Sequence, residues 1–264
     1  MHKELLNDWA VQLSDIDIKK LSKDEAQQIG KMVISNLVCV IKNQNLSEED
    51  QINFCDKIGN YQKSAEERSK HIHLTNGILR ITGQKNEHGQ PGLFAHTSAL
   101  DWHTDQASSL QRMPLVWLYG ASGTKGSRTS WINTKLAYDG LPESLKEQIQ
   151  DKKITLGYKA GGYSPEKFFK DHHHEDRHFS LVYTNDAGLK GLYFPFLQIF
   201  GGLDSKLIET LKQYVLKEEF VYHHDWEDGD VVISEQWLTL HKRWAFDKIN
   251  ERILHRIGFD YSKC

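Results

Sequence analysis

The alternation of apolar and polar residues predicts many short strands and a small number of helices. Apolar side chains recur at helical spacing in residues 23–36, which Ser22 introduces as the first residue of a capping box, so we expect a helix there. A second helix is expected after Ser47, which precedes an acidic first turn, and this helix should end near Gly59. Between them, residues 37–42 form an apolar run that is typical of a buried strand.

Short strand-like runs separated by turn residues dominate the rest of the chain. The runs are 78–82, 114–119, 127–132, 154–158, 179–184, 191–195, 221–226, 231–234, 237–241 and 252–261. Short helices are expected at 133–138 and 143–150, and a longer one is expected from a Ser205 cap through Leu216. Many short strands, with helices near the N-terminus and in connections, favour an antiparallel sheet core with added helices, an α+β or mainly β fold.

One region interrupts this pattern. The 264 residues contain no internal repeat and no linker, so we expect a single domain over 1–264 with an irregular, exposed insertion around 160–178. The run His172-His173-His174 lies in that insertion, and three adjacent residues cannot all face one ion on a regular element, so we expect a solvated loop.

Of His223 and His224, one is expected to pack inward and the other to be exposed.

Composition narrows the class of protein. The formal net charge is -3 and no basic stripe stands out, so nucleic acid is not the expected partner. The three cysteines are scattered and odd in number, which suggests a reducing compartment. No stretch approaches the roughly 20 apolar residues of a membrane span, and the N-terminus lacks the apolar run of a signal peptide. These features predict a cytoplasmic protein without a membrane partner.

His103 and Asp105 are the leading candidates for metal ligands. If their segment is extended, the side chains at i and i+2 point to the same face and can reach one ion. His241, far along the chain, is the candidate third ligand. Two histidines and one carboxylate that leave positions open form the facial triad of non-heme Fe(II) oxygenases. A chance H-x-D sequence and a core histidine are the alternative interpretation.

Two arginines in the last predicted strand strengthen the metal hypothesis. Arg252 and Arg256 share one face of the run 252–261, and guanidinium groups are suited to bind carboxylates through paired hydrogen bonds. A salt-bridged strand position is the alternative for either residue. His255 falls on the opposite face, where we expect a core histidine with its hydrogen bonds satisfied.

These segments together resemble the taurine/2,4-D dioxygenase superfamily (TauD/TfdA-like), including its clavaminate-synthase-like branch. Trp102-His103-Thr104-Asp105 matches the family's first ligand pair, and the segment 126–131 resembles its Gly-x-x-Thr-x-aromatic motif. The turn 226–230 resembles the one before the last ligand, and His241 is followed by the family's Arg-x-x-x-Arg spacing. Glu235-Gln236 stand where relatives carry an Asp-Asn pair, so both side chains are longer than in the family pattern.

The resemblance implies a double-stranded β-helix, or jelly-roll, fold that uses Fe(II) and 2-oxoglutarate. It implies that the iron ligands are His103, Asp105 and His241. It further implies that Arg252 and Thr129 hold the distal carboxylate of 2-oxoglutarate and that Arg256 lies near the substrate, where relatives meet an anionic group.

The implied activity is the oxidation, in the first place hydroxylation, of a C–H bond in a small polar or anionic substrate, such as an amino-acid-like compound. The reaction would consume O2 and release succinate and CO2. A non-catalytic jelly-roll metal-binding ligand sensor is the alternative from another class, although such a sensor has no need for the Arg252 anchor. A protein or peptide substrate, and association into a homo-oligomer as in many relatives, stay open.

Overall fold

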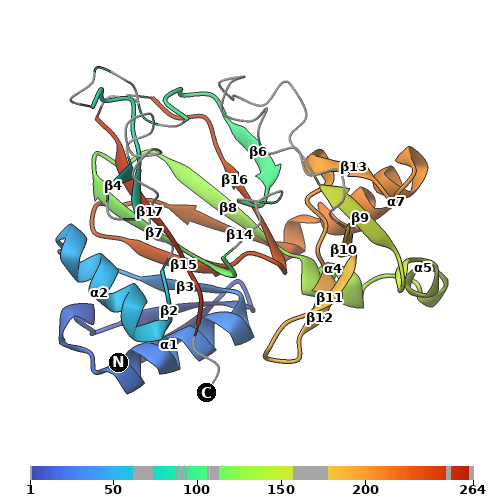
Figure 1. Ribbon diagram of the computed structural model, residues 1–264, viewed down its shortest axis with the longest axis horizontal. Coiled ribbons are helices and arrows are strands. Elements are labelled where there is room, and N and C mark those ends of the chain that lie inside the picture. Colours follow the sequence, from blue (N-terminus) through green and yellow to red (C-terminus); the bar gives the residue numbers. More distant parts are fainter. Residues whose placement is uncertain are drawn as a thin grey trace.

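Two facing β-sheets form the centre of the molecule (Figure 1). The computed structural model describes residues 2–61, 74–75, 77–86, 89, 92, 94–105, 107, 113–156, 178–247 and 251–261. Residues 157–177, which hold nearly all of the expected insertion and its histidine run, lie outside the described residues.

The larger sheet has eight strands in the described part of the chain, in the order β1-β2-β3-β15-β7-β17-β5-β4. Its strands are β1 (His2–Leu6), β2 (Ala10–Ser14), β3 (Val38–Ile41), β15 (Val231–Glu235), β7 (Leu115–Ser122), β17 (Ile253–Phe259), β5 (Ile78–Ile81) and β4 (Leu74–Thr75). Only the β2–β3 pair is parallel among these neighbours. Strands β3, β7 and β15 are apolar on both faces because each face is covered.

The smaller sheet carries three of the candidate site residues, His103, Thr129 and His241. Its order is β14-β8-β16-β6, all antiparallel. The strands are β14 (Val221–Asp225), β8 (Arg128–Asn133), β16 (Thr239–Arg243) and β6 (Leu100–His103). Trp131 and Tyr222 from this sheet share one buried cluster with Val38, Leu118 and Leu254 from the larger sheet, so apolar side chains fill the space between the two sheets.

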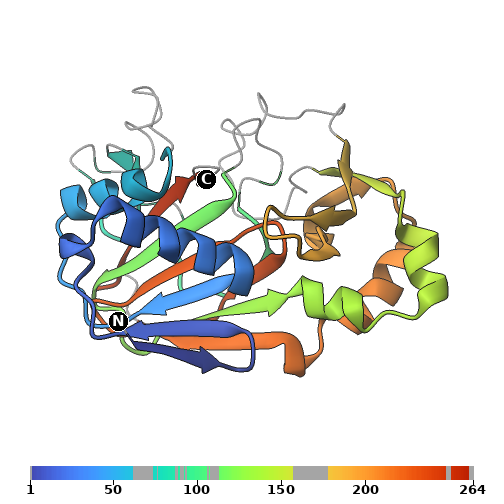
Figure 2. The ribbon, with the colours of Figure 1, turned by 90° about the horizontal axis from the view of Figure 1, so that it is seen from below.

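Two helices cover the other face of the larger sheet (Figure 2). They are α1 (Lys23–Asn36) and α2 (Glu48–Ile58), and each begins at a capping box, made by Ser22 with Glu25 and by Ser47 with Asp50. Both helices therefore match the sequence prediction. Their apolar faces pack on residues such as Ile41 and Trp117 and leave the opposite face of the sheet turned toward the smaller sheet.

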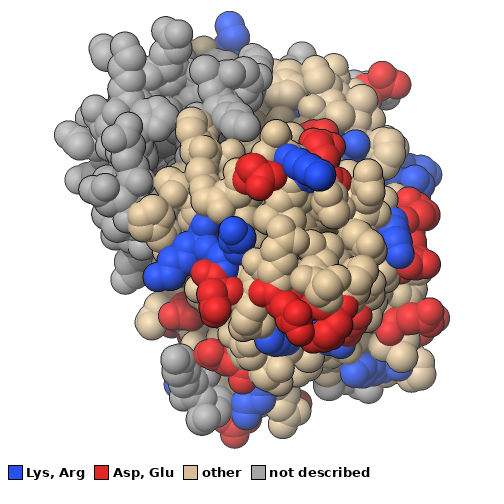
Figure 3. Space-filling view, turned by 90° about the vertical axis from the view of Figure 1, so that its right-hand side faces the viewer, with Lys and Arg blue, Asp and Glu red and all other residues tan. Residues whose placement is uncertain are grey.

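A lobe extends from the far end of the smaller sheet. It contains α4 (Thr134–Asp139), α5 (Glu143–Ile149), α7 (Ser205–Val215), β9 (Lys153–Leu156), β10 (His178–Ser180), β11 (Val182–Thr184), β12 (Lys190–Leu192), β13 (Ile199–Gly201) and the 3-10 turn η3 (Phe196–Gln198). On the described part of the face that this lobe presents, basic side chains lie scattered among acidic ones (Figure 3). No helix in the described part of the chain is long and apolar enough to cross a membrane.

Two local expectations were wrong, and one element was not anticipated. The run 179–184 is divided between two strands. Before the buried Leu181 the chain, as β10, pairs with β9, and after it the chain, as β11, pairs with β12. The cap of α7 is Asp204, whose carboxylate accepts a hydrogen bond from the Leu207 amide, rather than Ser205. The N-terminal hairpin of β1 and β2 was not anticipated, since β1 is exposed and lacks an apolar run.

Candidate active site

The register of the smaller sheet brings the candidate ligands together. In the β16–β6 pair, His241 lies directly opposite His103, although the two residues are 138 positions apart in the sequence. Residues opposite each other in antiparallel strands have neighbouring side chains on one face. Asp105 follows two residues after the end of β6 and joins the histidines from the turn that begins there.

The three ligand atoms form a compact group. Asp105 Oδ1 lies 3.7 Å from His103 Nε2 and 3.6 Å from His241 Nε2. All three atoms lie within 4.8 Å of one another, and the imidazole rings are 4.2 Å apart between centroids. Each side chain is partly exposed, so one side of the group remains open to a ligand. Two imidazoles and one carboxylate are the donor set that suits Fe(II) with open coordination positions.

Hydrogen bonding and burial keep both imidazoles ready to bind a metal. The Nδ1–H group of His103 donates to the Asp101 carbonyl at 2.6 Å, and this places the lone pair on Nε2, which faces the group. Burial, together with the neighbouring His103, lowers the pKa of His241 to about 3. His241 is therefore neutral at physiological pH and can donate a lone pair to a cation.

Asp105 divides its two oxygens between the histidines and Arg256. Oδ1 faces the imidazoles, and Oδ2 accepts a hydrogen bond of 2.5 Å from Arg256 Nε. Burial would raise the pKa of Asp105, but the positive charge of Arg256 outweighs it and holds the pKa well below its ordinary value. The carboxylate is thus ionised. Arg256 also has a buried Nη2 group with no hydrogen-bond partner in the described part of the chain.

Arg252 immediately precedes β17, the strand whose Arg256 contacts Asp105, and part of its guanidinium is unused. Its side chain is only 1% exposed, its Nε donates to Ser127 Oγ at 3.1 Å, and its guanidinium lies 4.7 Å from the centre of the Phe246 ring. Nη1 has no partner, and no carboxylate pairs with Arg252 among the described residues. Burial and the nearby charge of Arg243 lower the pKa of Arg252 to about 9. A bound carboxylate would supply the missing acceptor and the missing negative charge.

Thr129 lies on β8 two residues after Ser127, and its side chain is buried. Its hydroxyl oxygen accepts a hydrogen bond of 2.9 Å from Trp226 Nε1, which leaves the hydroxyl hydrogen available for another acceptor. The position is compatible with a second donor for the carboxylate that Arg252 would bind.

Sequence reasoning missed the surroundings of these arginines. Arg243 is buried, donates to the carbonyl oxygens of Phe94, His96 and Ser98, and lies 5.3 Å from the Phe246 ring that Arg252 also contacts. It thereby ties the segment before β6 to the strand that bears His241. A signal was present, because Arg243 is two residues after His241 and so shares its face of β16.

The predicted core histidines lie where expected. His255 is buried on the opposite face of β17 from the arginines, and its Nδ1 lies 3.1 Å from the amide nitrogen of Gln51. His224 is buried beside Asp230, while His223 is partly exposed beside Glu218. Their hydrogen-bond contacts within the described residues are with groups such as Gln51, Asp230 and Glu218 and not with the candidate ligands.

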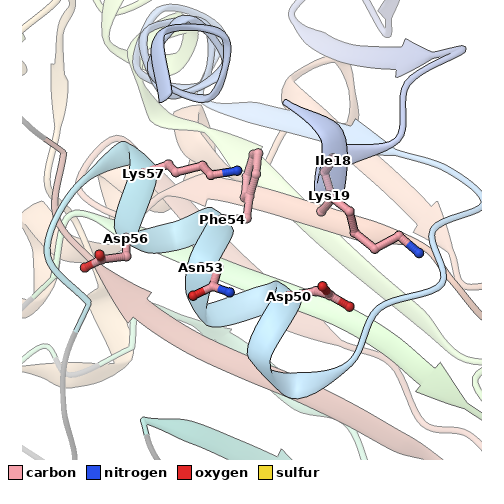
Figure 4. A pocket seen from close by; sticks show the side chains of 7 residues that line it. All are labelled: Ile18, Lys19, Asp50, Asn53, Phe54, Asp56 and Lys57. Atoms are coloured by element: carbon pink, nitrogen blue, oxygen red, sulfur yellow. The ribbon is translucent and has the colours of Figure 1, made fainter. Parts of the chain in front are cut away.

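A separate surface pocket of about 300 Å³ lies between η1 (Ile18–Lys20) and α2 (Figure 4). Three of its four charged side chains are already engaged: Lys19 donates to the Asn45 carbonyl, Lys57 donates to the Leu21 carbonyl, and Asp50 caps its own helix. It lies on the helical side of the larger sheet, away from the candidate ligands, and we assign it no function.

Comparison with known proteins agrees with this geometry. The family described as "Taurine catabolism dioxygenase TauD, TfdA family" matches residues 2–257. The chain is 24% identical to the alpha-ketoglutarate-dependent 2,4-dichlorophenoxyacetate dioxygenase of Cupriavidus pinatubonensis, over 94% of this chain and 93% of that protein. It is 22% identical to pentalenolactone F synthase of Streptomyces avermitilis, over 88% of this chain and 84% of that protein.

Solved structures share the fold. The structure of AAD-2 in complex with Mn(II) and N-oxalylglycine superposes with a TM-score of 0.81 at 21% identity and covers 99% of both chains. A taurine dioxygenase from Burkholderia xenovorans gives a TM-score of 0.74 at 21% identity, over 96% of this chain and 86% of that one. The jelly-roll fold expected from the sequence is therefore confirmed.

Proposed function

This chain belongs to the taurine catabolism dioxygenase TauD, TfdA family, and from that membership we propose that it oxidises a C–H bond of a small polar or anionic substrate. The protein is an Fe(II)- and 2-oxoglutarate-dependent dioxygenase that uses O2 and a small-molecule substrate. Hydroxylation is the outcome that we propose, and an amino-acid-like compound is one candidate substrate.

In this proposal each named side chain has one task. His103, Asp105 and His241 would hold the iron on one side and leave its other side open. The unpaired Nη1 of Arg252, with the Thr129 hydroxyl, would bind the distal carboxylate of 2-oxoglutarate. Bound Fe(II) would let O2 and 2-oxoglutarate supply the oxidising power, and 2-oxoglutarate would be converted to succinate and CO2. The protein orients the reactants and excludes water.

Arg256 supports an anionic substrate. Its Nε is committed to Asp105, so its position is fixed, and its buried Nη2 still lacks an acceptor. A substrate carboxylate could fill that place while the Arg256–Asp105 contact aims it at the open side of the iron site. The relative that acts on 2,4-dichlorophenoxyacetate uses a substrate of this charge. An amino-acid-like carboxylate would satisfy the same group.

The single observation that carries the proposal is the guanidinium nitrogen of Arg252 that lacks a partner among the described residues, four positions before the Arg256 that contacts Asp105 of the candidate triad. A metal-binding sensor would need the triad alone, and a buried unpaired charge would then be an unexplained cost. This feature favours a cosubstrate-using enzyme over the sensor.

The test begins with anaerobic titration of the metal-free protein with Fe(II) and then 2-oxoglutarate, followed by visible absorbance, with His103→Ala as the control. We expect a weak charge-transfer band that requires both additions and is lost in the variant. Small carboxylates and amino acids are then screened for succinate release. The substrate proposal is wrong if none of them accelerates 2-oxoglutarate turnover.

A further inference from the structure

Thr104, the residue between two of the proposed metal ligands, is held by a glutamine from a distant part of the chain. Gln198 ends η3 in the lobe and is only 8% exposed. Its Oε1 accepts a hydrogen bond of 3.0 Å from the Thr104 amide, and its Nε2 donates at 3.0 Å to the Thr104 carbonyl. One side chain therefore satisfies both backbone polar groups of Thr104.

This contact takes the place of a sheet ladder. Strand β6 ends at His103, and the β16–β6 register is irregular next to that residue, so no strand pairing among the described residues fixes Thr104 or Asp105. A backbone with unpaired polar groups in a buried position is unfavourable and free to rearrange. Gln198 supplies the two hydrogen bonds that a neighbouring strand would otherwise provide.

A second glutamine, Gln236, also holds the segment Thr104–Asp105 through hydrogen bonds. Its Oε1 accepts a hydrogen bond of 3.0 Å from the Asp105 amide, and its carbonyl accepts one of 3.0 Å from the Thr104 hydroxyl. Gln236 comes from the turn that precedes β16, whereas Gln198 comes from the lobe, so two separate elements fix the same short segment.

We propose that Gln198 is a positioning residue for the metal site, acting through the Thr104 backbone to hold Asp105 Oδ1 within reach of both imidazoles. The proposal rests on the proposed metal ligands. Packing alone does not explain a glutamine here, because its neighbours Phe196 and Ile199 are apolar and a buried amide is costly unless it is hydrogen-bonded. Both hydrogen bonds of the Gln198 side chain go to Thr104.

The test is the affinity for Mn(II), measured from the electron paramagnetic resonance signal of the free ion, without 2-oxoglutarate or substrate. Gln198→Met keeps the length of the side chain and removes both hydrogen bonds. Loss of an outer-shell partner typically weakens metal binding about 10- to 100-fold, so we expect the Mn(II) Kd to rise by that factor. Gln198→Asn, which stays polar but is one methylene shorter, is the second variant if the methionine variant does not fold.

Gln44 offers a matched control. It is equally buried, its Oε1 accepts from the Ile18 amide, and its Nε2 donates to the carbonyls of Ile16 and Lys42, all on the helical side of the larger sheet. Gln44→Met should lower the thermal midpoint yet leave the Mn(II) Kd within about twofold of wild type, because an outer-shell effect acts only on ligands that it supports.

The outcomes separate the two proposals. Folded Gln198 variants that bind Mn(II) like wild type, or a Gln44→Met protein that weakens Mn(II) binding to the same extent, would overturn the positioning role and leave the metal site intact. A wild-type protein that binds no Mn(II) would instead overturn the proposed ligand set on which this inference rests. Weakened Mn(II) binding that is confined to the Gln198 variants supports the positioning role of Gln198.

Discussion

Replacing Arg252 with methionine removes a buried guanidinium while it keeps a long apolar side chain in the same space. Arg252 is 1% exposed, donates once to Ser127 and has Nη1 unpaired. If that nitrogen binds the distal carboxylate of 2-oxoglutarate, the variant loses one partner of a desolvated charge pair. Such a loss costs about 2–5 kcal/mol. Since about 1.4 kcal/mol corresponds to a tenfold change, the Kd for 2-oxoglutarate should rise roughly 30-fold or more.

The stability of the metal-free protein should respond differently. The guanidinium contributes a hydrogen bond and the Phe246 ring contact, but it is charged, buried and without a carboxylate partner among the described residues. The desolvation cost of an unpaired buried charge is several kcal/mol, which offsets those contacts. We therefore expect Arg252→Met to leave the thermal midpoint of the cosubstrate-free protein unchanged or higher, and to abolish the increase that 2-oxoglutarate produces in wild type.

The assay is an anaerobic titration of the Fe(II)-loaded protein with 2-oxoglutarate, followed by visible absorbance, with thermal unfolding in parallel. Arg128→Met is the matched control, because Arg128 lies next to Thr129 on β8 but is paired with Asp225 and is 43% exposed. It should titrate like wild type. A normal Kd in Arg252→Met, combined with a clear loss of stability, would refute the reasoning and make Arg252 a structural residue.

Three further predictions concern the metal site, the pH dependence of stability and one turn. Asp105→Asn should lose at least tenfold in Mn(II) affinity by equilibrium dialysis, since an amide is neutral; an unchanged affinity would contradict the ligand assignment. Burial raises the pKa of Glu235 to about 8, so the folded state keeps a proton that the unfolded state releases above about pH 4.5. The free energy of unfolding of the wild-type protein should therefore fall as pH rises from about 5 to 8. In denaturant titrations, Glu235→Gln should remove this pH dependence. If the free energies of unfolding of the wild type and the variant change with pH in parallel, the titration of Glu235 is excluded as the cause. Gly123→Ala would bring a methyl group into collision with the Glu251 carbonyl oxygen, whereas Gly126→Ala, also at positive φ, meets nothing within 4 Å. Calorimetry should show Gly123→Ala to be the less stable variant, and equal thermal midpoints would argue against the clash.

Local signals determined much of the fold. Capping boxes at Ser22 and Ser47 act within one helical turn, and both helices begin where the sequence predicted. Alternation placed Arg252 and Arg256 on the face opposite His255, and the structure keeps that division within β17, where Arg256 contacts Asp105 and His255 contacts Gln51. The match to the family pattern then gave the fold and the cofactors that the comparisons show.

Only the tertiary structure decided how distant residues meet. The register that sets His241 opposite His103 comes from pairing across the whole smaller sheet. Gln198 contacts Thr104 across a sequence separation of 94 positions, and Arg256 contacts Asp105 across a separation of 151 positions. Spacing along a strand or helix fixes the direction of a side chain over a few residues, whereas its partner depends on how separate elements pack. The sequence therefore pointed to the candidate residues, and the packing of the two sheets and the lobe decided which side chains meet and what holds each one in place.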